Sequence, residues 1–135
     1  LEEALKQTAQ EFSERLGFQV VLDYSLPPRM FSPNEEIHVL QIVREALANV
    51  YKHAQASQAW VKVYQKAGSI MVEVRDNGVG LPEQGAPPSH YGLVIMRDRS
   101  LTLGGELSVA NAEGGGTVVR LAMPRGASSL ITQAS

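Results

Sequence analysis

Val74-Arg75-Asp76-Asn77-Gly78-Val79-Gly80-Leu81 is the stretch that decides the fold, because a strand pattern runs there directly into a glycine-rich turn that carries a carboxylate. Upstream, apolar residues recur with the strand period of two and are expected on the buried face: Ile70, Val72 and Val74. Asp76 falls on that same face. A carboxylate directed inward is costly unless a specific polar group meets it, and Gly78 and Gly80 leave room for a ligand near the backbone. The stretch predicts a binding site, although Asp-Asn-Gly alone is also an ordinary turn signal.

Length and composition indicate one domain that needs no metal or disulfide to hold its core. The chain has 135 residues, no cysteine and a formal net charge of -2. The absence of cysteine fits a reducing compartment, so we expect a cytoplasmic location. The charge gives no electrostatic basis for binding nucleic acid, and no apolar run is long enough to span a bilayer, so neither nucleic acid nor membrane is an expected direct contact. The chain begins at Leu1 without an initiator Met, so we expect it to be a piece of a longer polypeptide.

The order of predicted elements favours an α+β fold, a two-layer sandwich with helices on one face of a mixed sheet. Helical spacing is found over residues 1–16, from Ser32 to about Ala54, and over 92–103; strand alternation is found over 18–24, 58–66, 69–76, 106–110 and 117–123. Ala67-Gly68 predicts a hairpin turn. Residues 82–91 are dense in proline and glycine and predict a mobile loop, and residues 125–135 a disordered tail. No second domain is predicted.

The helix beginning at Ser32 has two unlike sides. Ser32-Pro33-Asn34-Glu35 has the form of a capping box with proline at the first helical position. One side of the helix is apolar, and the other carries Glu45, Asn49 and Lys52. By spacing alone this polar stripe is most simply a solvated face. Asn49, however, is a poor helix former in a helix interior, which indicates coordination or hydrogen bonding.

A second inward polar group is expected at the start of the last strand. Thr117 shares its alternation with Val119, Leu121 and Met123. If that is the core face, its hydroxyl points inward like the carboxylate of Asp76, and the two groups could share one ligand.

Four separated segments resemble the ATP-binding domain of histidine kinases in the gyrase, Hsp90, histidine kinase and MutL superfamily. They are Glu45-Ala-Leu-Ala-Asn49-Val-Tyr-Lys52-His53 (N box), Asp76-Asn-Gly78-Val-Gly80 (G1 box), Tyr91-Gly92-Leu93 with Met96-Arg97-Asp98-Arg99 (G2 region), and Gly114-Gly-Gly116-Thr117. The Met-Arg-x-Arg run followed by Leu-Gly-Gly is similar to the nitrate/nitrite sensor kinase branch. The resemblance covers about residues 18–124 and implies the Bergerat sandwich.

The resemblance also implies the site and its ligands, ATP and Mg²⁺. Asp76 would accept a hydrogen bond from the adenine amino group, with Thr117 supporting it through water, and Asn49 would hold Mg²⁺ between the phosphates. Phosphate contacts would come from Lys52, His53, Arg97 and Arg99, and residues 82–91 would form the ATP lid. Glu45 would position a water, polarise the attacking nitrogen or orient Asn49. The remaining nucleotide-binding positions are Gly78, Gly80, Tyr91, Gly92, Leu93 and Gly116.

Two residues differ from the family motif, and several candidate site residues have simpler structural explanations. Tyr91 stands where many relatives have a first glycine, and Asp98 replaces a commoner glutamate. His53 could simply favour a helix C-terminus, His38 is expected at the surface, and Arg97 or Arg99 could be solvated helix charges.

The predicted function is that of a two-component sensor kinase catalytic domain. It would transfer the γ-phosphoryl group of ATP to a histidine on a separate dimerisation domain of the same kinase, for signalling to a response regulator. The parent protein would be an inner-membrane sensor with this domain in the cytoplasm. The alternatives are a degenerate nucleotide-binding or interaction domain, and a serine-phosphorylating anti-sigma kinase or ATPase of the same superfamily.

Overall fold

A computed structural model describes residues 1–80 and 91–125, with the backbone alone at His53, Ala54 and Tyr91. The elements follow in the order α1 (Glu2–Leu16), β1 (Val20–Tyr24), α2 (Pro33–Asn49), the π-helical turn η1 (Val50–Ala54), β2 (Ala59–Lys66), β3 (Ser69–Asp76), α3 (Tyr91–Thr102), β4 (Glu106–Asn111) and β5 (Thr117–Pro124). This is the predicted order of elements. The predicted loop over 82–91, apart from Tyr91, and most of the predicted tail lie outside the described residues.

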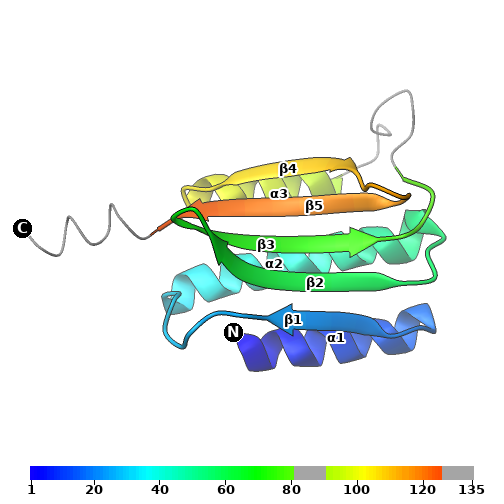
Figure 1. The fold of residues 1–135 in the computed structure, drawn as a ribbon, viewed down its shortest axis with the longest axis horizontal. Helices are drawn as coiled ribbons and strands as arrows, with labels where there is room; N and C mark the ends of the chain where they lie inside the picture. The colour runs from blue at the N-terminus through cyan, green and yellow to red at the C-terminus, as the bar shows by residue number, and fades with distance from the viewer. Residues whose placement is uncertain (81–90, 126–135) are drawn as a thin grey trace, which may run out of the picture.

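The five strands form one mixed sheet in the order β1-β2-β3-β5-β4. β1 pairs with β2 in parallel, and the other neighbours are antiparallel. Helices α1, α2 and α3 lie on one face of this sheet, so the molecule has two layers (Figure 1). The predicted α+β sandwich is confirmed.

The core lies between the two layers, and the strand alternation decides which residues enter it. Ala59, Val61 and Val63 of β2 are at most 1 % exposed, while their neighbours Trp60 and Lys62 lie on the opposite face. The helices contribute Leu5, Phe12, Val39, Ile42, Val43, Leu47 and Met96 to the same cluster. Fully burying one such aliphatic side chain stabilises the fold by about 1.5 to 3 kcal/mol. The helix-facing side of the sheet is therefore fixed, which also fixes the direction of Asp76.

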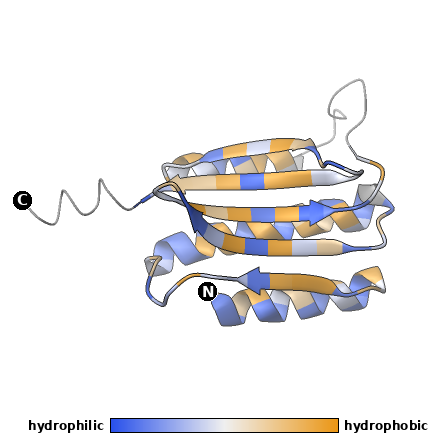
Figure 2. Cartoon of the chain, viewed as in Figure 1, coloured by the Kyte–Doolittle hydropathy of each residue, from blue (hydrophilic) through white to orange (hydrophobic). Residues whose placement is uncertain are grey.

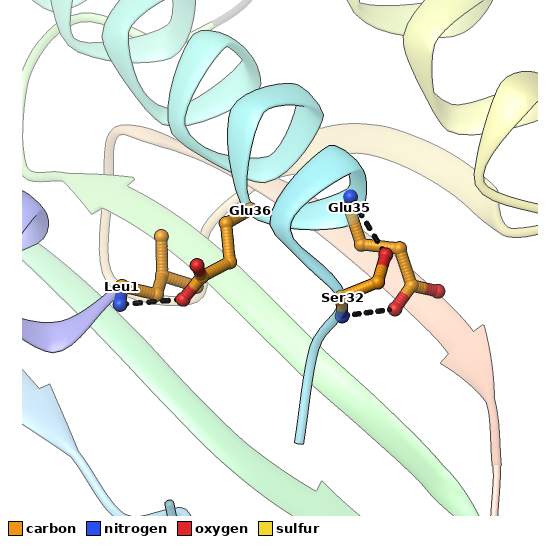
Figure 3. Close-up of polar contacts among 4 residues, drawn as sticks. All are labelled: Leu1, Ser32, Glu35 and Glu36. Carbon is orange, nitrogen blue, oxygen red and sulfur yellow. Dashed lines mark hydrogen bonds and ion pairs between the residues drawn. The ribbon is translucent and has the colours of Figure 1, made fainter. Parts of the chain in front are cut away.

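The start of α2 is held by the predicted capping box (Figure 3). The Ser32 hydroxyl accepts a hydrogen bond from the backbone N–H of Glu35 at 3.1 Å, and the Glu35 carboxylate accepts one from the N–H of Ser32 at 2.8 Å. The backbone nitrogen of Leu1 lies 2.6 Å from the carboxylate of Glu36. These contacts satisfy helix N-terminal donors and join the start of α1 to the first turn of α2.

Arg125, the first residue of the predicted tail, is held by contacts with the folded domain. Pro124 is the last residue of β5. The backbone N–H of Arg125 donates to the carbonyl of Gly68 at 2.6 Å, and its guanidinium pairs with Glu35. Arg125 is thus part of the folded domain, and residues 126–135 lie outside the described part of the chain.

Within residues 1–80 and 91–125, no helix combines the length and apolar character needed to cross a membrane.

Candidate functional site

Four segments that carry predicted site residues meet at one edge of the sheet. The end of α2, the end of β3, the start of α3 and the turn between β4 and β5 all lie at the right-hand side of Figure 1. Residues 45–53, 76–80, 91–99 and 114–117, which are far apart in the sequence, belong to these segments. The candidate site is therefore built where the helix layer and the sheet end together.

Asp76 is the buried carboxylate of this edge. It is only 4 % exposed and points toward the helix layer with Val74 and Val72. The N–H of Gly78 donates to its Oδ1 at 2.7 Å, and the backbone of Thr117 also hydrogen-bonds to it. Burial raises the pKa of Asp76, and the two backbone hydrogen bonds oppose that rise. Such a carboxylate is a strong acceptor in a weakly polar setting, where a matching donor is strongly favoured.

Glycines let the neighbouring turns approach Asp76. Gly116 has φ +90°, and a Cβ at this position would lie 1.9 Å from the backbone oxygen of Asp76. At Gly80, with φ +80°, a Cβ would lie 2.9 Å from Oδ1 of Asn111 and 3.3 Å from the carbonyl of Gly116. On its Cβ side, Gly80 is therefore closely packed against Asn111 and the β4–β5 turn. Gly80 and Gly116 serve the close packing of the chain around Asp76.

The polar stripe of α2 is covered in part by the start of α3. A Cβ on Gly92 would lie 3.0 Å from the Glu45 carboxylate and 3.3 Å from both amide atoms of Asn49. Glu45 and Asn49 are half-buried, which differs from the solvated face that spacing alone favours. Lys52 is exposed on η1. The α-helix changes to a π-helical turn directly after Asn49, a distortion that is frequent at functional sites.

The two candidate arginines of α3 have different surroundings. Arg97 is exposed. Arg99 has one guanidinium nitrogen 3.1 Å from Nδ1 of His38, and both residues are half-buried. His38 is therefore not the free surface residue that the sequence suggested. It lies eleven residues before Asn49 on α2, about 16 Å along the helix, so Arg99 is held at the other end of the α2–α3 contact.

Leu93 and Asn77 have structural contacts. Leu93 is partly buried and packs against the core. The side-chain oxygen of Asn77 accepts from the backbone N–H groups of Ser57 and Gln58, both at 2.9 Å, and its nitrogen donates to the Ser57 hydroxyl. Asn77 thus ties the end of β3 to the segment before β2. The local sequence predicts only a turn at Asn77, because no short-range pattern indicates partners about twenty residues away.

The structure also brings Thr117 to Asp76, as its alternation predicts. Val119, Leu121 and Met123 are buried on the helix-facing side of β5, and Thr117 at the start of that strand shares their face. Its backbone reaches the Asp76 carboxylate. The side chains of His53 and Tyr91 lie outside the described part of the structure, so their predicted contacts are not tested.

The chain is similar to known proteins over most of its length. Residues 34–127 match the family described as histidine kinase-, DNA gyrase B-, and HSP90-like ATPase. The nitrate/nitrite sensor protein NarX of Escherichia coli K12 is 47% identical over 119 residues, which cover 88% of this chain and 20% of that protein. The nitrate/nitrite sensor protein NarQ of the same strain is 39% identical over 122 residues, with 90% and 22% covered. The chain thus spans about a fifth of the length of these curated relatives.

A solved structure shares the fold. The histidine kinase domain of the blue-light activated histidine kinase EL346 from Erythrobacter litoralis superposes with a TM-score of 0.76 at 25% identity, over 89% of this chain and 58% of that one. The sequence match covers more than half of the chain and includes all four segments of the candidate site. The chain therefore belongs to the histidine kinase-, DNA gyrase B-, and HSP90-like ATPase family, as a homologue of the ATP-binding catalytic domain of sensor histidine kinases.

Proposed function

We propose that this domain binds Mg-ATP at the described edge of the sheet and, in the full-length kinase, delivers its γ-phosphoryl group to a histidine on a separate dimerisation domain. A response regulator would then receive the phosphoryl group from that domain. The observation that carries the proposal is the buried carboxylate of Asp76, placed at the same edge as the half-buried pair Glu45 and Asn49. The Asp76 carboxylate suits the amino group of a nucleotide base, and the Glu45–Asn49 pair suits a metal ion bound to phosphates.

Adenine recognition is assigned to Asp76. A purine amino group is a neutral donor, and a buried ionised acceptor forms a stronger hydrogen bond with it than an exposed one does. Gly78 and Thr117 already fix the orientation of the carboxylate through their backbones. The Thr117 hydroxyl lies at the same strand end and would support the base through a water molecule.

The residues present fit Mg²⁺. Asn49 offers an amide oxygen beside the carboxylate of Glu45, and hard oxygen donors are the ligands this ion prefers. Among the described residues no group of three or more His, Cys, Asp and Glu side chains could hold a metal. This agrees with an ion that is shared with the nucleotide phosphates, as is usual for Mg²⁺. When bound, the ion would neutralise phosphate charge during transfer.

The remaining polar residues would act on the phosphates and on the acceptor. Lys52 on η1 and Arg97 in the middle of α3 are exposed cations, and His53 follows Lys52. We leave Arg99 out of the phosphate contacts because His38 engages it. Glu45 would polarise the attacking histidine nitrogen or position a water, while the bond between the γ-phosphorus and the β–γ bridging oxygen breaks and a bond to that nitrogen forms.

The parent protein is proposed to be a membrane sensor with this domain on the cytoplasmic side. NarX and NarQ are named as nitrate/nitrite sensors, which makes these anions the first signals to test on the full-length protein. Nothing in this domain is proposed to bind them.

Substituting Asn49 with Ala should weaken nucleotide binding mainly when Mg²⁺ is present. The variant removes a proposed metal ligand and leaves Asp76 untouched, so the loss should be about tenfold or more with Mg²⁺ and small in EDTA. Calorimetric titration with ADP in both buffers measures the two losses. A Gln41→Ala variant, also on α2, is the matched control and should bind as the wild type does. Equal losses with and without Mg²⁺ would make Asn49 a structural residue.

The isolated chain should bind ATP and fail to phosphorylate itself. Transfer needs a nucleophile held in line with the leaving oxygen, and a bound triphosphate without one lacks that proximity. His38 is engaged with Arg99 and lies far from Asn49 along α2. Incubation with γ-labelled ATP and Mg²⁺, followed by analysis of acid-labile phosphate and mass mapping, gives the answer. Stoichiometric phosphohistidine at His38, His53 or His90 would contradict the proposed division of labour, and label transfer to an added dimerisation domain would support it.

A further inference from the structure

The face of the sheet opposite the helices carries a row of alternating charges. The strand register places Asp23 beside Lys62, Lys62 beside Glu73, and Glu73 beside Arg120. All four side chains are on the helix-free face, because their strand neighbours Val61, Val63, Val72, Val74, Val119 and Leu121 are buried on the other one. Figure 2 shows the row as a column of hydrophilic colour across β1, β2, β3 and β5. Its signs read minus, plus, minus, plus from β1 to β5.

Apolar and aromatic residues flank this row on both sides. On one side the register aligns Val21, Trp60, Arg75 and Val118, and on the other it aligns Tyr64, Met71 and Ala122. The Arg75 guanidinium lies 6.0 Å from the centre of the Trp60 ring. Trp, Tyr, Met and Arg are the residue types enriched at protein–protein interfaces. A solvent-facing sheet that collects all four is a candidate interface.

The charge row is self-complementary under one two-fold rotation. Consider a second copy turned over about an axis that runs along the strands, between β2 and β3. Lys62 then faces Glu73 of the second copy, and Asp23 faces its Arg120. By symmetry each of these pairs occurs twice in the dimer. A two-fold axis across the strands would instead place each charge opposite itself. The order of signs therefore selects one arrangement, and an isologous contact of this kind closes as a dimer.

The flanking rows match under the same rotation. Trp60 faces Arg75 of the second copy, Val21 faces its Val118, and Tyr64 faces Met71. These pairs are a cation–π pair, an aliphatic pair and a sulfur–aromatic pair, all of which are favourable. A hollow of about 500 Å³ beside Asp23 and Trp60 gives the long Arg120 side chain of the second copy room to enter.

We propose that the helix-free sheet face is a self-association surface, on which two copies of this domain pack sheet to sheet with the strands of the two copies pointing the same way. The contact is a weak one. The facing patch of four strands (β1, β2, β3 and β5), spaced about 4.8 Å apart and about five residues long, covers roughly 300 Å² per copy, below the roughly 800 Å² per partner of stable complexes. Association is therefore expected to be weak and transient, as for other small interfaces. Both candidate nucleotide sites stay open, because they lie at the edge between the sheet and the helices.

Sedimentation velocity of the chain from about 10 µM to 1 mM tests the proposal. We expect a concentration-dependent shift toward a dimer that weakens when NaCl is raised from 50 to 500 mM, since charge pairs are screened. Trp60 is the single tryptophan of the chain, so its fluorescence should change with the same midpoint. A monomer throughout this range, or a dimer whose formation leaves Trp60 fluorescence unchanged, would overturn the proposal.

Charge-reversal variants test the arrangement itself. Lys62→Glu or Glu73→Lys alone places like charges opposite each other and should weaken self-association at least tenfold. A one-to-one mixture of the two variants makes every facing pair opposite in sign, so the mixture should associate again. Lys6→Glu is the control, because the Lys6 side chain is 55 % exposed on α1, away from the sheet. This variant changes the net charge by the same amount as Lys62→Glu and should self-associate as the wild type does. Failure of the mixture to associate, with both variants folded, would overturn the arrangement.

The Glu73 carboxylate also accepts a hydrogen bond from Tyr64 and pairs with Arg120, so the Glu73→Lys variant could lose stability within one copy. A second pair of variants therefore tests the same arrangement without changing Glu73. Asp23→Lys and Arg120→Asp change the outer ends of the row. Each alone should lose self-association, and their mixture should recover it by the same reversal of signs. Loss in both variants without recovery in the mixture would count against the two-fold arrangement.

Discussion

Replacing Asp76 with Asn should weaken adenine nucleotide binding by roughly 5- to 150-fold while leaving the domain at least as stable as the wild type at neutral pH. The amide presents donors where the base also presents one, and a mispaired buried group costs about 1 to 3 kcal/mol, or roughly 5- to 150-fold in affinity. The stability gain follows from the sign of the pKa shift. Burial raises the pKa of Asp76 in the folded state. A carboxyl whose folded pKa is raised stabilises the fold below its unfolded pKa and loses that contribution as pH rises through the folded value.

The test combines calorimetry with ADP and thermal unfolding between pH 4 and 7. The variant should unfold at the same or a higher temperature than the wild type at pH 7, and the difference should shrink toward pH 4 as Asp76 protonates. Glu3→Gln is the matched control, because it removes the same charge from a carboxylate whose side chain is 82 % exposed on α1. Wild-type ADP affinity in a folded Asp76→Asn variant would remove Asp76 from the base site.

Local patterns in the sequence predict most of the fold because short-range chemistry sets it. The capping box at Ser32 and Glu35 depends on residues three apart, and the Ala67-Gly68 hairpin depends on adjacent ones; both are present in the structure. The strand alternation likewise places Asp76 on the buried face, as observed. Element ends differ by one or two residues, since pairing with neighbours decides where a strand stops.

Contacts between distant segments could not be predicted in this way. The Arg99–His38 and Arg125–Glu35 pairs join residues 61 and 90 positions apart, and no periodicity encodes either partner. Glu45 and Asn49 are half-buried because Gly92 packs against them, and Gly92 reaches them only through the packing of α3 on α2. The roles of the residues toward ATP and Mg²⁺ follow from the resemblance to histidine kinases. The strand alternation alone predicts that the Asp76 carboxylate points inward.

The self-complementary sheet face illustrates the same limit. Each strand shows which of its residues face away from the core, so the charges of Lys62 and Glu73 are assigned to the outer face by alternation alone. Their order across the sheet depends on register and on the β1-β2-β3-β5-β4 topology, in which β5 lies between β3 and β4. A symmetric charge pattern is therefore a property of the fold and not of any one segment.

Substituting Gly116 with Ala should destabilise the domain far more than substituting Gly114 with Ala, although the two glycines have nearly the same φ angle. Gly114 has φ +85° and Gly116 φ +90°, so each alanine carries the steric cost of a positive φ, about 1 to 2 kcal/mol. A Cβ at Gly114 would meet nothing within 4 Å. At Gly116 it would lie 1.9 Å from the backbone oxygen of Asp76 and 2.6 Å from its carbonyl carbon.

The clash at Gly116 involves backbone on both sides, so rotation of a side chain cannot relieve it. Either β5 separates from the end of β3, which removes the Thr117 hydrogen bond to Asp76, or the turn after Asp76 moves. We therefore expect a loss of about 4 kcal/mol or more in the free energy of unfolding for Gly116→Ala, in the range that marks severe backbone strain, against about 1 to 2 kcal/mol for Gly114→Ala. Urea denaturation measures both losses, and ADP titration of any folded fraction should show binding retained by Gly114→Ala and lost by Gly116→Ala. Equal destabilisation of the two variants would mean that the β4–β5 turn does not need its close approach to Asp76, and the conformation of that carboxylate would then have to be set by Gly78 alone.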